Sequence, residues 1–352
     1  TNGAVVEISN FEKLESLSSS AVISRSGAKV IISKGKLVTS QAIDTFLLEK
    51  GGHVSVTKVG KLLSEGAAVF RSEGSSVSVA ECGVIRGQVT SAIVSGSDDK
   101  YELRNVGDIS GKNDGITNIG NRSSFRISDV GRIVGDTRDG ISVGDNCTLS
   151  IRDTKEVVGT IRNGISAGGE MSLTLINVEL VQGEERHGIT AGSGATIRAS
   201  EVGKIVGKES KGIVVGGKSD IQCSNVGTIE GGDEDGILVQ GGNSNVSLKF
   251  GGAVKAFVGS GVRIDGSNNT LVIHDYGEIE AIEGDGVFVF GGVARIENVD
   301  RIAGGGSAIH FTNRSSATVK NVRIVHGGDH GFKLGESEAT IVSTELLKGG
   351  SS

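Results

Sequence analysis

A dipeptide whose second residue is Gly or Ala recurs every 22 to 25 residues between positions 114 and 331. An apolar residue follows the dipeptide directly, and another follows two positions later. Because side chains of a strand alternate between its faces, both apolar residues point to the same side. The first apolar column consists of Ile116, Ile141, Ile165, Ile189, Ile213, Ile237, Val262, Val287, Ile309 and Phe332. A short strand therefore recurs with a nearly fixed period.

Each repeat also contains two other short apolar segments. Leu149 and Ile151 represent the second segment, and Ile133 and Val157 the third. Stacking the repeats as coils buries these columns together and pairs equivalent strands in parallel, whereas about 24 residues are too few for a βαβ unit. The sequence therefore predicts an all-β fold: a right-handed parallel β-helix of about 14 coils of roughly 22–26 residues, with three short strands per coil. We expect one such domain over residues 20–350, after an N-terminal segment, residues 1–19.

The composition agrees with many short strands joined by tight turns. The chain has 57 Gly, no Pro and no Trp. Its apolar residues are mostly Val, Ile, Leu and Ala, and the β-branched ones favour strands, whereas Gly favours turns. A net charge of −6 argues against a nucleic-acid partner, which requires a basic face. No apolar run is long enough to span a membrane, and the first ten residues lack the features of a signal peptide.

Asn or Asp recurs at the turn between the second and third strands, at positions 105, 129, 177, 225, 298 and 321. These side chains could bind a cation, or they could form a ladder of hydrogen bonds with neighbouring coils and their own backbone. We predict the ladder. Asp also precedes Gly in several coils, but His187 and Lys211 interrupt that column, which argues against calcium. We expect no metal and no cofactor.

The three cysteines are predicted to be small buried residues. Cys82, Cys147 and Cys223 lie about three coils apart, or roughly 14 Å, which is beyond the reach of a disulfide.

The two ends differ from the repeat. Residues 10–19 are predicted to form a short capping helix, with Ser9 as N-cap and Glu12 in the capping-box position. The apolar residues near one face of this helix are Phe11, Leu14 and Leu17. Such a helix would cover the open end of a β-helix. Residues 345–350 offer no comparable lid, so we expect that the chain was cut from a longer protein or meets a partner there.

Several segments resemble the repeats of bacterial autotransporter passenger domains and other secreted β-helix proteins: residues 266–271 (GSNNTL), 277–279 (GEI) and 285–287 (DGV). The wider resemblance, over about residues 20–350, is to the pectin-lyase-like superfamily, which includes polysaccharide lyases, glycoside hydrolases and phage tailspikes. The resemblance implies a secreted or bacterial cell-surface protein. No catalytic motif of those enzymes can be matched residue by residue.

One group of ionisable residues is a candidate for catalysis. His187, Lys211 and Asp235 occupy the same turn position of adjacent coils, about 4.8 Å apart, and Asp233 precedes the last of them by two residues. An acid and a base on one face could process a polysaccharide, so a lyase, a hydrolase or a tailspike-like protein is the alternative function. The same residues could instead form a solvated line of opposite charges. Without Trp and with only two Tyr, a sugar cleft would lack its usual aromatic floor.

An outward row of residues changes character along the chain. It is polar in four coils and then becomes apolar at Val214, Leu238 and Phe288, with Phe290 on the same side. Exposed apolar residues on a rigid face usually mark a contact surface. The main prediction is a non-enzymatic secreted or cell-surface rod that acts as an adhesin or a structural or assembly protein. Its expected partner is a cell-surface or matrix molecule, a glycan, or a second copy of the chain.

Overall fold

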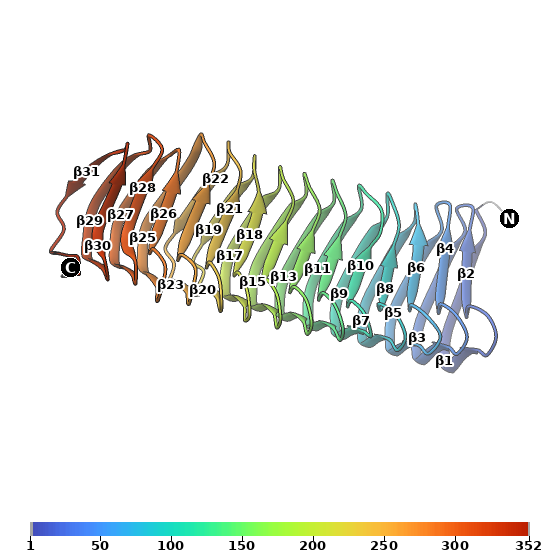
Figure 1. Cartoon of the computed structure of the whole chain (residues 1–352). Helices are drawn as coiled ribbons and strands as arrows, with labels where there is room; N and C mark the ends of the chain where they lie inside the picture. Colours follow the sequence, from blue (N-terminus) through green and yellow to red (C-terminus); the bar gives the residue numbers. More distant parts are fainter. Residues whose placement is uncertain (1–2, 351–352) are drawn as a thin grey trace. The chain divides into compact units, whose positions relative to one another are not determined.

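The computed structural model describes residues 3–350 and contains strands and turns throughout this range. The chain folds as an all-β parallel solenoid of about 14 coils, as the repeat predicted. The chain divides into two compact units between residues 172 and 173. In both units the successive coils stack one on another (Figure 1). No helix within the described range could cross a membrane.

In unit 1, each coil supplies one long strand and one short strand. The long strands are β1 (Val5–Ser16), β3 (Lys29–Ser40), β5 (His53–Ser64), β7 (Ser76–Gly87), β9 (Lys100–Gly111), β11 (Ser124–Gly135) and β13 (Thr148–Gly159). The short strands are β2 (Val22–Arg25), β4 (Phe46–Glu49), β6 (Phe70–Glu73), β8 (Ile93–Ser95), β10 (Ile116–Asn118), β12 (Ile141–Val143) and β14 (Ile165–Ala167).

Unit 2 follows the same plan, but three of its long strands are interrupted. The continuous long strands are β15 (Ser172–Gly183), which begins at the boundary, β17 (Thr196–Gly207), β25 (Asn269–Ala281), β27 (Gly292–Gly304) and β29 (Ser316–Gly327). The interrupted ones are β19 (Asp220–Ser224) with β20 (Thr228–Gly231), β22 (Asn245–Lys249) with β23 (Ala253–Ala256), and β31 (Glu338–Val342) with β32 (Leu346–Lys348). The short strands are β16 (Ile189–Ala191), β18 (Ile213–Gly216), β21 (Ile237–Gln240), β24 (Val262–Asp265), β26 (Val287–Phe290), β28 (Ser307–Thr312) and β30 (His330–Gly335).

Equivalent strands pair in parallel with like residues in register, so each predicted apolar column lies inside. Ile141 pairs with Ile165 in the first column, and both are fully buried. Ile133 and Val157 of the third segment also pair and are fully buried. The core is therefore a set of ladders of Ile, Val and Leu running from coil to coil. Burial of such side chains contributes about 1.5–3 kcal/mol each.

Most long strands bend at one residue with positive φ, which separates the second and third predicted segments. Asp129 has φ 53°, Asn298 has φ 54° and Asn321 has φ 53°. Asn and Asp tolerate this left-handed conformation better than most residues. In unit 2 the Asn298 amide donates to Asp275 Oδ1 at 2.8 Å, and the Asn321 amide donates to Asn298 Oδ1 at 3.0 Å. The predicted ladder is thus present across these three coils.

The prediction of a capping helix over residues 10–19 is wrong. Residues 5–16 form β1, which pairs with β3 and places Phe11 opposite Gly35. Asn10 has φ 56°, so the chain turns a corner there. Beyond a corner, the inward residues are three apart, as in the buried pair Val130 and Ile133. Phe11 and Leu14 have this spacing, which in a sequence resembles one face of a helix.

In one inward column of unit 2, a glycine on one coil lies next to a tyrosine on the following coil. Gly251 and Tyr276 lie on adjacent coils, and Gly277 N donates to Gly251 O at 3.0 Å. Val226 and Val299 precede and follow them at the same inward position. A Cβ on Gly251 would overlap the Tyr276 ring, which is 2 % exposed. The ring therefore fills the volume that Gly251 leaves empty.

Cys82, Cys147 and Cys223 are free and buried, as predicted. Burial raises the pKa of the Cys82 and Cys223 thiols to about 12. Both thiols are therefore protonated at neutral pH and unsuited to nucleophilic or redox chemistry.

Candidate functional site

Where a Gly lies directly before a short strand, the residue in front of that Gly connects one coil to the next. In unit 1, Asp139 N donates to Asp114 Oδ1 at 3.1 Å, and Asn163 N donates to Asp139 Oδ1 at 2.9 Å. Burial raises the pKa of both Asp114 and Asp139. These side chains satisfy backbone N–H groups that would otherwise be buried without a partner.

The predicted catalytic candidates occupy this same column in unit 2. Lys211 N donates to His187 Nδ1 at 3.4 Å, and Ser260 N donates to Asp235 Oδ1 at 2.7 Å. The Lys211 ammonium forms an ion pair with Glu234, and Asp233 is exposed. The sequence thus placed His187, Lys211 and Asp235 correctly along one column.

Their electrostatics follow from burial. Burial lowers the pKa of His187 to about 4, and the positive charges of Lys211 and Arg186 act in the same direction. Burial also lowers the pKa of Lys211 and raises that of Asp235. His187 is neutral at pH 7, and the lone pair of its Nδ1 is directed at the Lys211 backbone. The column therefore contains groups capable of acid–base behaviour, but His187 Nδ1 and Asp235 Oδ1 already accept backbone N–H groups of the next coil.

The outward row of the short strands runs through Thr190, Val214, Leu238, Arg263 and Phe288 in consecutive register. Val214 is 8 % exposed and Leu238 is 4 % exposed, so the prediction that they are exposed is wrong. In such a row each side chain is flanked on both sides by neighbours about 4.8 Å away. Val214 and Leu238 therefore offer little apolar surface to a partner.

The same row is more open at β26. Phe288 is partly buried, and Phe290 is 39 % exposed. The Arg263 guanidinium lies 5.0 Å from the centre of the Phe288 ring, a cation–π distance. On the other side, the His310 ring meets Phe288 edge to face, with 5.0 Å between ring centroids. We call Arg263, Phe288, Phe290 and His310 the β26 patch.

Two carboxylates orient the polar members of the β26 patch. His310 Nδ1 lies 2.9 Å from Asp285 Oδ2, and Arg263 Nε donates to Asp265 Oδ2 at 2.9 Å. Asp285 Oδ1 also accepts from Ser307 N at 2.7 Å. The sequence reasoning missed His310, although it occupies the outward row one coil after Phe288. An aromatic centre with a polar, fixed rim is typical of contact surfaces.

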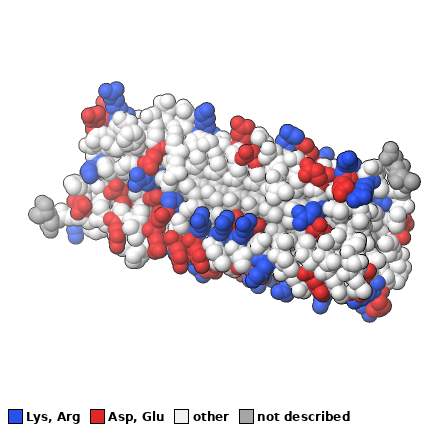
Figure 2. All heavy atoms as spheres, turned by 45° about the vertical axis from the view of Figure 1, so that its right-hand side comes forward, with Lys and Arg blue, Asp and Glu red and all other residues white. Residues whose placement is uncertain are grey.

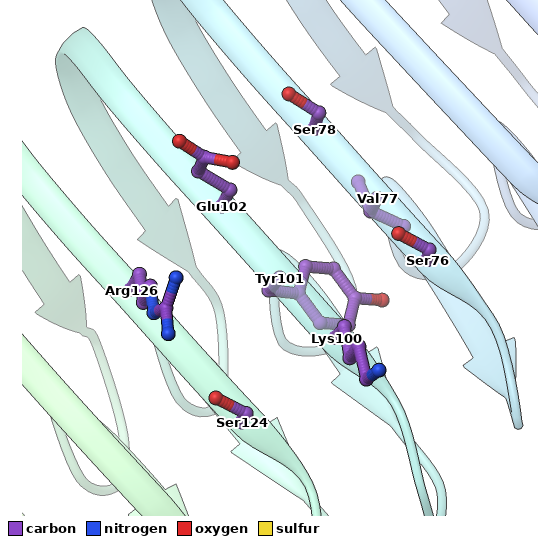
Figure 3. Close-up of a pocket in the computed structure, with 8 residues that line it drawn as sticks. All are labelled: Ser76, Val77, Ser78, Lys100, Tyr101, Glu102, Ser124 and Arg126. Atoms are coloured by element: carbon purple, nitrogen blue, oxygen red, sulfur yellow. The ribbon is translucent and has the colours of Figure 1, made fainter.

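A separate depression of about 330 Å³ lies on the outer face of β7, β9 and β11 in unit 1 (Figure 3). Ser78, Glu102 and Arg126 are in register across it, and Tyr101 lies beneath, 2 % exposed. The Tyr101 hydroxyl lies 2.6 Å from Ser72 Oγ in the interior. Short Ser side chains lie next to long charged ones here and create the hollow. It is therefore an unevenness of the outer surface of the sheet. Nowhere in residues 3–350 do three or more His, Cys, Asp or Glu side chains form a group that could hold a metal ion.

No protein-family model matches this chain, and no curated protein or solved structure matches it significantly.

Proposed function

We propose that this chain is a secreted or cell-surface β-solenoid that acts without catalysis, as an adhesin or assembly protein, through the β26 patch. The single observation that carries the proposal is the arrangement around Phe288 and Phe290. Two aromatic side chains on one strand face outward, and the patch includes both a cation and an imidazole. Aromatic and Arg side chains dominate the binding energy of protein interfaces.

The catalytic alternative has weaker support. His187 Nδ1 and Asp235 Oδ1 both accept backbone N–H groups from the next coil. A general base must reach a substrate proton with a free lone pair.

The secreted or surface location, the right-handed winding and the autotransporter likeness rest on the resemblance of the repeats. Detection of the protein in culture medium or on intact cells tests the location.

The first experiment compares the wild type with Phe288→Ser/Phe290→Ser. Phe250→Ser is the matched control, because Phe250 is 58 % exposed in the same unit but lies outside the patch. Light scattering gives the mass in solution, and retention of labelled protein on cells gives binding to a foreign surface.

Each outcome has a defined meaning. A wild-type oligomer that becomes monomeric only in the double variant identifies a second copy as the partner. A monomeric wild type whose cell binding is lost only in the double variant identifies a foreign partner. If the double variant has the same mass in solution and the same cell binding as the wild type, the proposal is contradicted.

A further inference from the structure

A second exposed apolar cluster lies in unit 2, in the turns after β23 and β25. Phe257 is 49 % exposed, Val258 47 % and Ile282 56 %. Ile282 N donates to Ala256 O at 3.1 Å, so Phe257 and Ile282 hold equivalent places on adjacent coils. We call Phe257, Val258 and Ile282 the apolar ridge.

The coils on either side leave space around the ridge. Gly232 and Gly305 occupy the equivalent turn position there, because Gly232 N bonds Gly207 O and Gly305 N bonds Ala281 O. With no side chain at Gly232, Phe257 and Ile282 border a depression of about 270 Å³ on that side. Glu230, Lys255 and Glu280 also line it.

Two acidic side chains line this depression, one on each side of Lys255, which pairs with Glu280. Glu230, Lys255 and Glu280 lie in register on β20, β23 and β25. Glu280 is already engaged, because Arg301 Nη1 lies 2.9 Å from its Oε1. By contrast, within the described residues, no ion pair involves Glu230 or the exposed Glu283, which follows Ile282 directly. Unpaired carboxylates thus lie next to exposed apolar side chains.

The charge of the chain is unevenly divided. Residues 1–172 contain 20 basic and 20 acidic residues, whereas residues 173–352 contain 16 basic and 22 acidic ones. On the face shown in Figure 2, acidic side chains occur along the chain and are densest beside a row of Lys and Arg side chains. Unit 2 therefore supplies the whole net charge of −6. Such a surface attracts cations and repels nucleic acids and anionic membranes.

We infer that the apolar ridge and its carboxylates bind a Lys- or Arg-rich segment of a partner protein. A single Arg or Lys side chain supplies both complements, since its aliphatic stem covers apolar surface while its charged head reaches a carboxylate. The Phe257 ring adds a cation–π contact. A symmetric contact with a second copy would instead place this carboxylate-bearing surface against an identical one.

The test uses a synthetic peptide of alternating Leu and Arg, six residues long with blocked ends, and fluorescence anisotropy. The variants are Phe257→Ser/Ile282→Ser and Glu230→Gln/Glu283→Gln. Glu336→Gln/Glu338→Gln is the control, because it removes the same charge from exposed residues elsewhere in unit 2. Circular dichroism verifies that each variant is folded.

The wild type and the control should bind the peptide alike, more weakly as salt rises, and each test variant should bind at least about tenfold more weakly, or 1.4 kcal/mol. Three results would overturn the inference: no binding by the wild type, equal loss in the control variant, or unchanged binding in Phe257→Ser/Ile282→Ser. Equal binding of a peptide with Glu in place of Arg would overturn it as well. None of these results depends on Phe288 or Phe290.

Discussion

At the scale of single residues, Asp99 shows how the interior accommodates charge. Its carboxylate is fully buried in unit 1 and accepts four hydrogen bonds. Two come from the backbone N–H groups of Ser75 and Gly96, at 2.7 and 2.8 Å. The hydroxyls of Ser72 and Ser95 donate the other two, at 2.7 and 2.8 Å. A buried carboxylate is tolerated only with such partners.

Replacing Asp99 should therefore be costly. We expect Asp99→Ala to lower the free energy of unfolding by about 3 kcal/mol, because it removes the acceptor of four hydrogen bonds and leaves the buried Ser75 N–H without a partner. Asp99→Asn should cost less, since its amide oxygen still accepts two of the bonds. Urea titration measures both midpoints. If Asp99→Ala unfolds at the wild-type midpoint, the network is not stabilising.

His187 should make unit 2 sensitive to acid. Its pKa is about 4 in the folded protein and 6.5 for an ordinary imidazole, as in the unfolded chain. Between these two pH values the unfolded state therefore binds the proton more tightly than the folded state does. The stabilisation is complete above pH 6.5 and is lost as the pH falls toward 4, by roughly 1–2 kcal/mol once solvent screening of this half-buried group is allowed for. His187→Asn should remove this loss, because an amide oxygen can accept the Lys211 N–H, as the Asp139 side chain accepts the Asn163 N–H in unit 1. Urea midpoints at pH 7 and pH 5 measure the difference, and an equal drop in both proteins would refute it.

At the scale of the element, the stability of the inward column at Gly251 and Tyr276 should depend on the two residues together rather than on either alone. Gly251→Val should clash with the Tyr276 ring and cost about 2 kcal/mol. Tyr276→Val should leave a cavity and cost about 3 kcal/mol. The double variant restores Val at successive coils, so its cost should fall below the sum by at least about 1 kcal/mol. Unfolding midpoints of all four proteins close the cycle, and strict additivity would show that the two positions do not interact.

The strands and their columns could be predicted because every coil repeats the same inward positions, as Ile141 and Ile165 illustrate. The first coil was misassigned because a corner imposes a spacing of three on Phe11 and Leu14, and a single repeat does not separate that spacing from a helix. Exposure in the outward row was only partly predictable. Leu238 and Phe290 are both large and apolar, but exposure depends on the neighbouring strands, which the sequence of one coil does not specify.

At the scale of the whole molecule, stability should be local, because each coil is held mainly by its neighbours. Ile133→Ala on β11 and Ile302→Ala on β27 remove fully buried side chains from equivalent positions in the two units. Each should cost about 3 kcal/mol. Hydrogen exchange should show faster exchange in β9, β11 and β13 for the first variant, and in β25, β27 and β29 for the second. Uniformly faster exchange along the chain in either variant would indicate a single cooperative unit instead.

The residues that precede the Gly before the short strands repeat the same contacts from coil to coil. Where a side chain of this column accepts a backbone N–H, that N–H belongs to the following coil, as in Asn163 N to Asp139 and Ser260 N to Asp235. Backbone N–H groups also donate in the opposite direction, as in Gly140 N to Asn163 O at 3.0 Å, so every coil meets its two neighbours through a repeated set of contacts. A duplicated or deleted repeat leaves matching sides facing each other, so a gene encoding such a chain can change length in whole coils without requiring a new kind of contact. A repeat inserted in part would break that match at once.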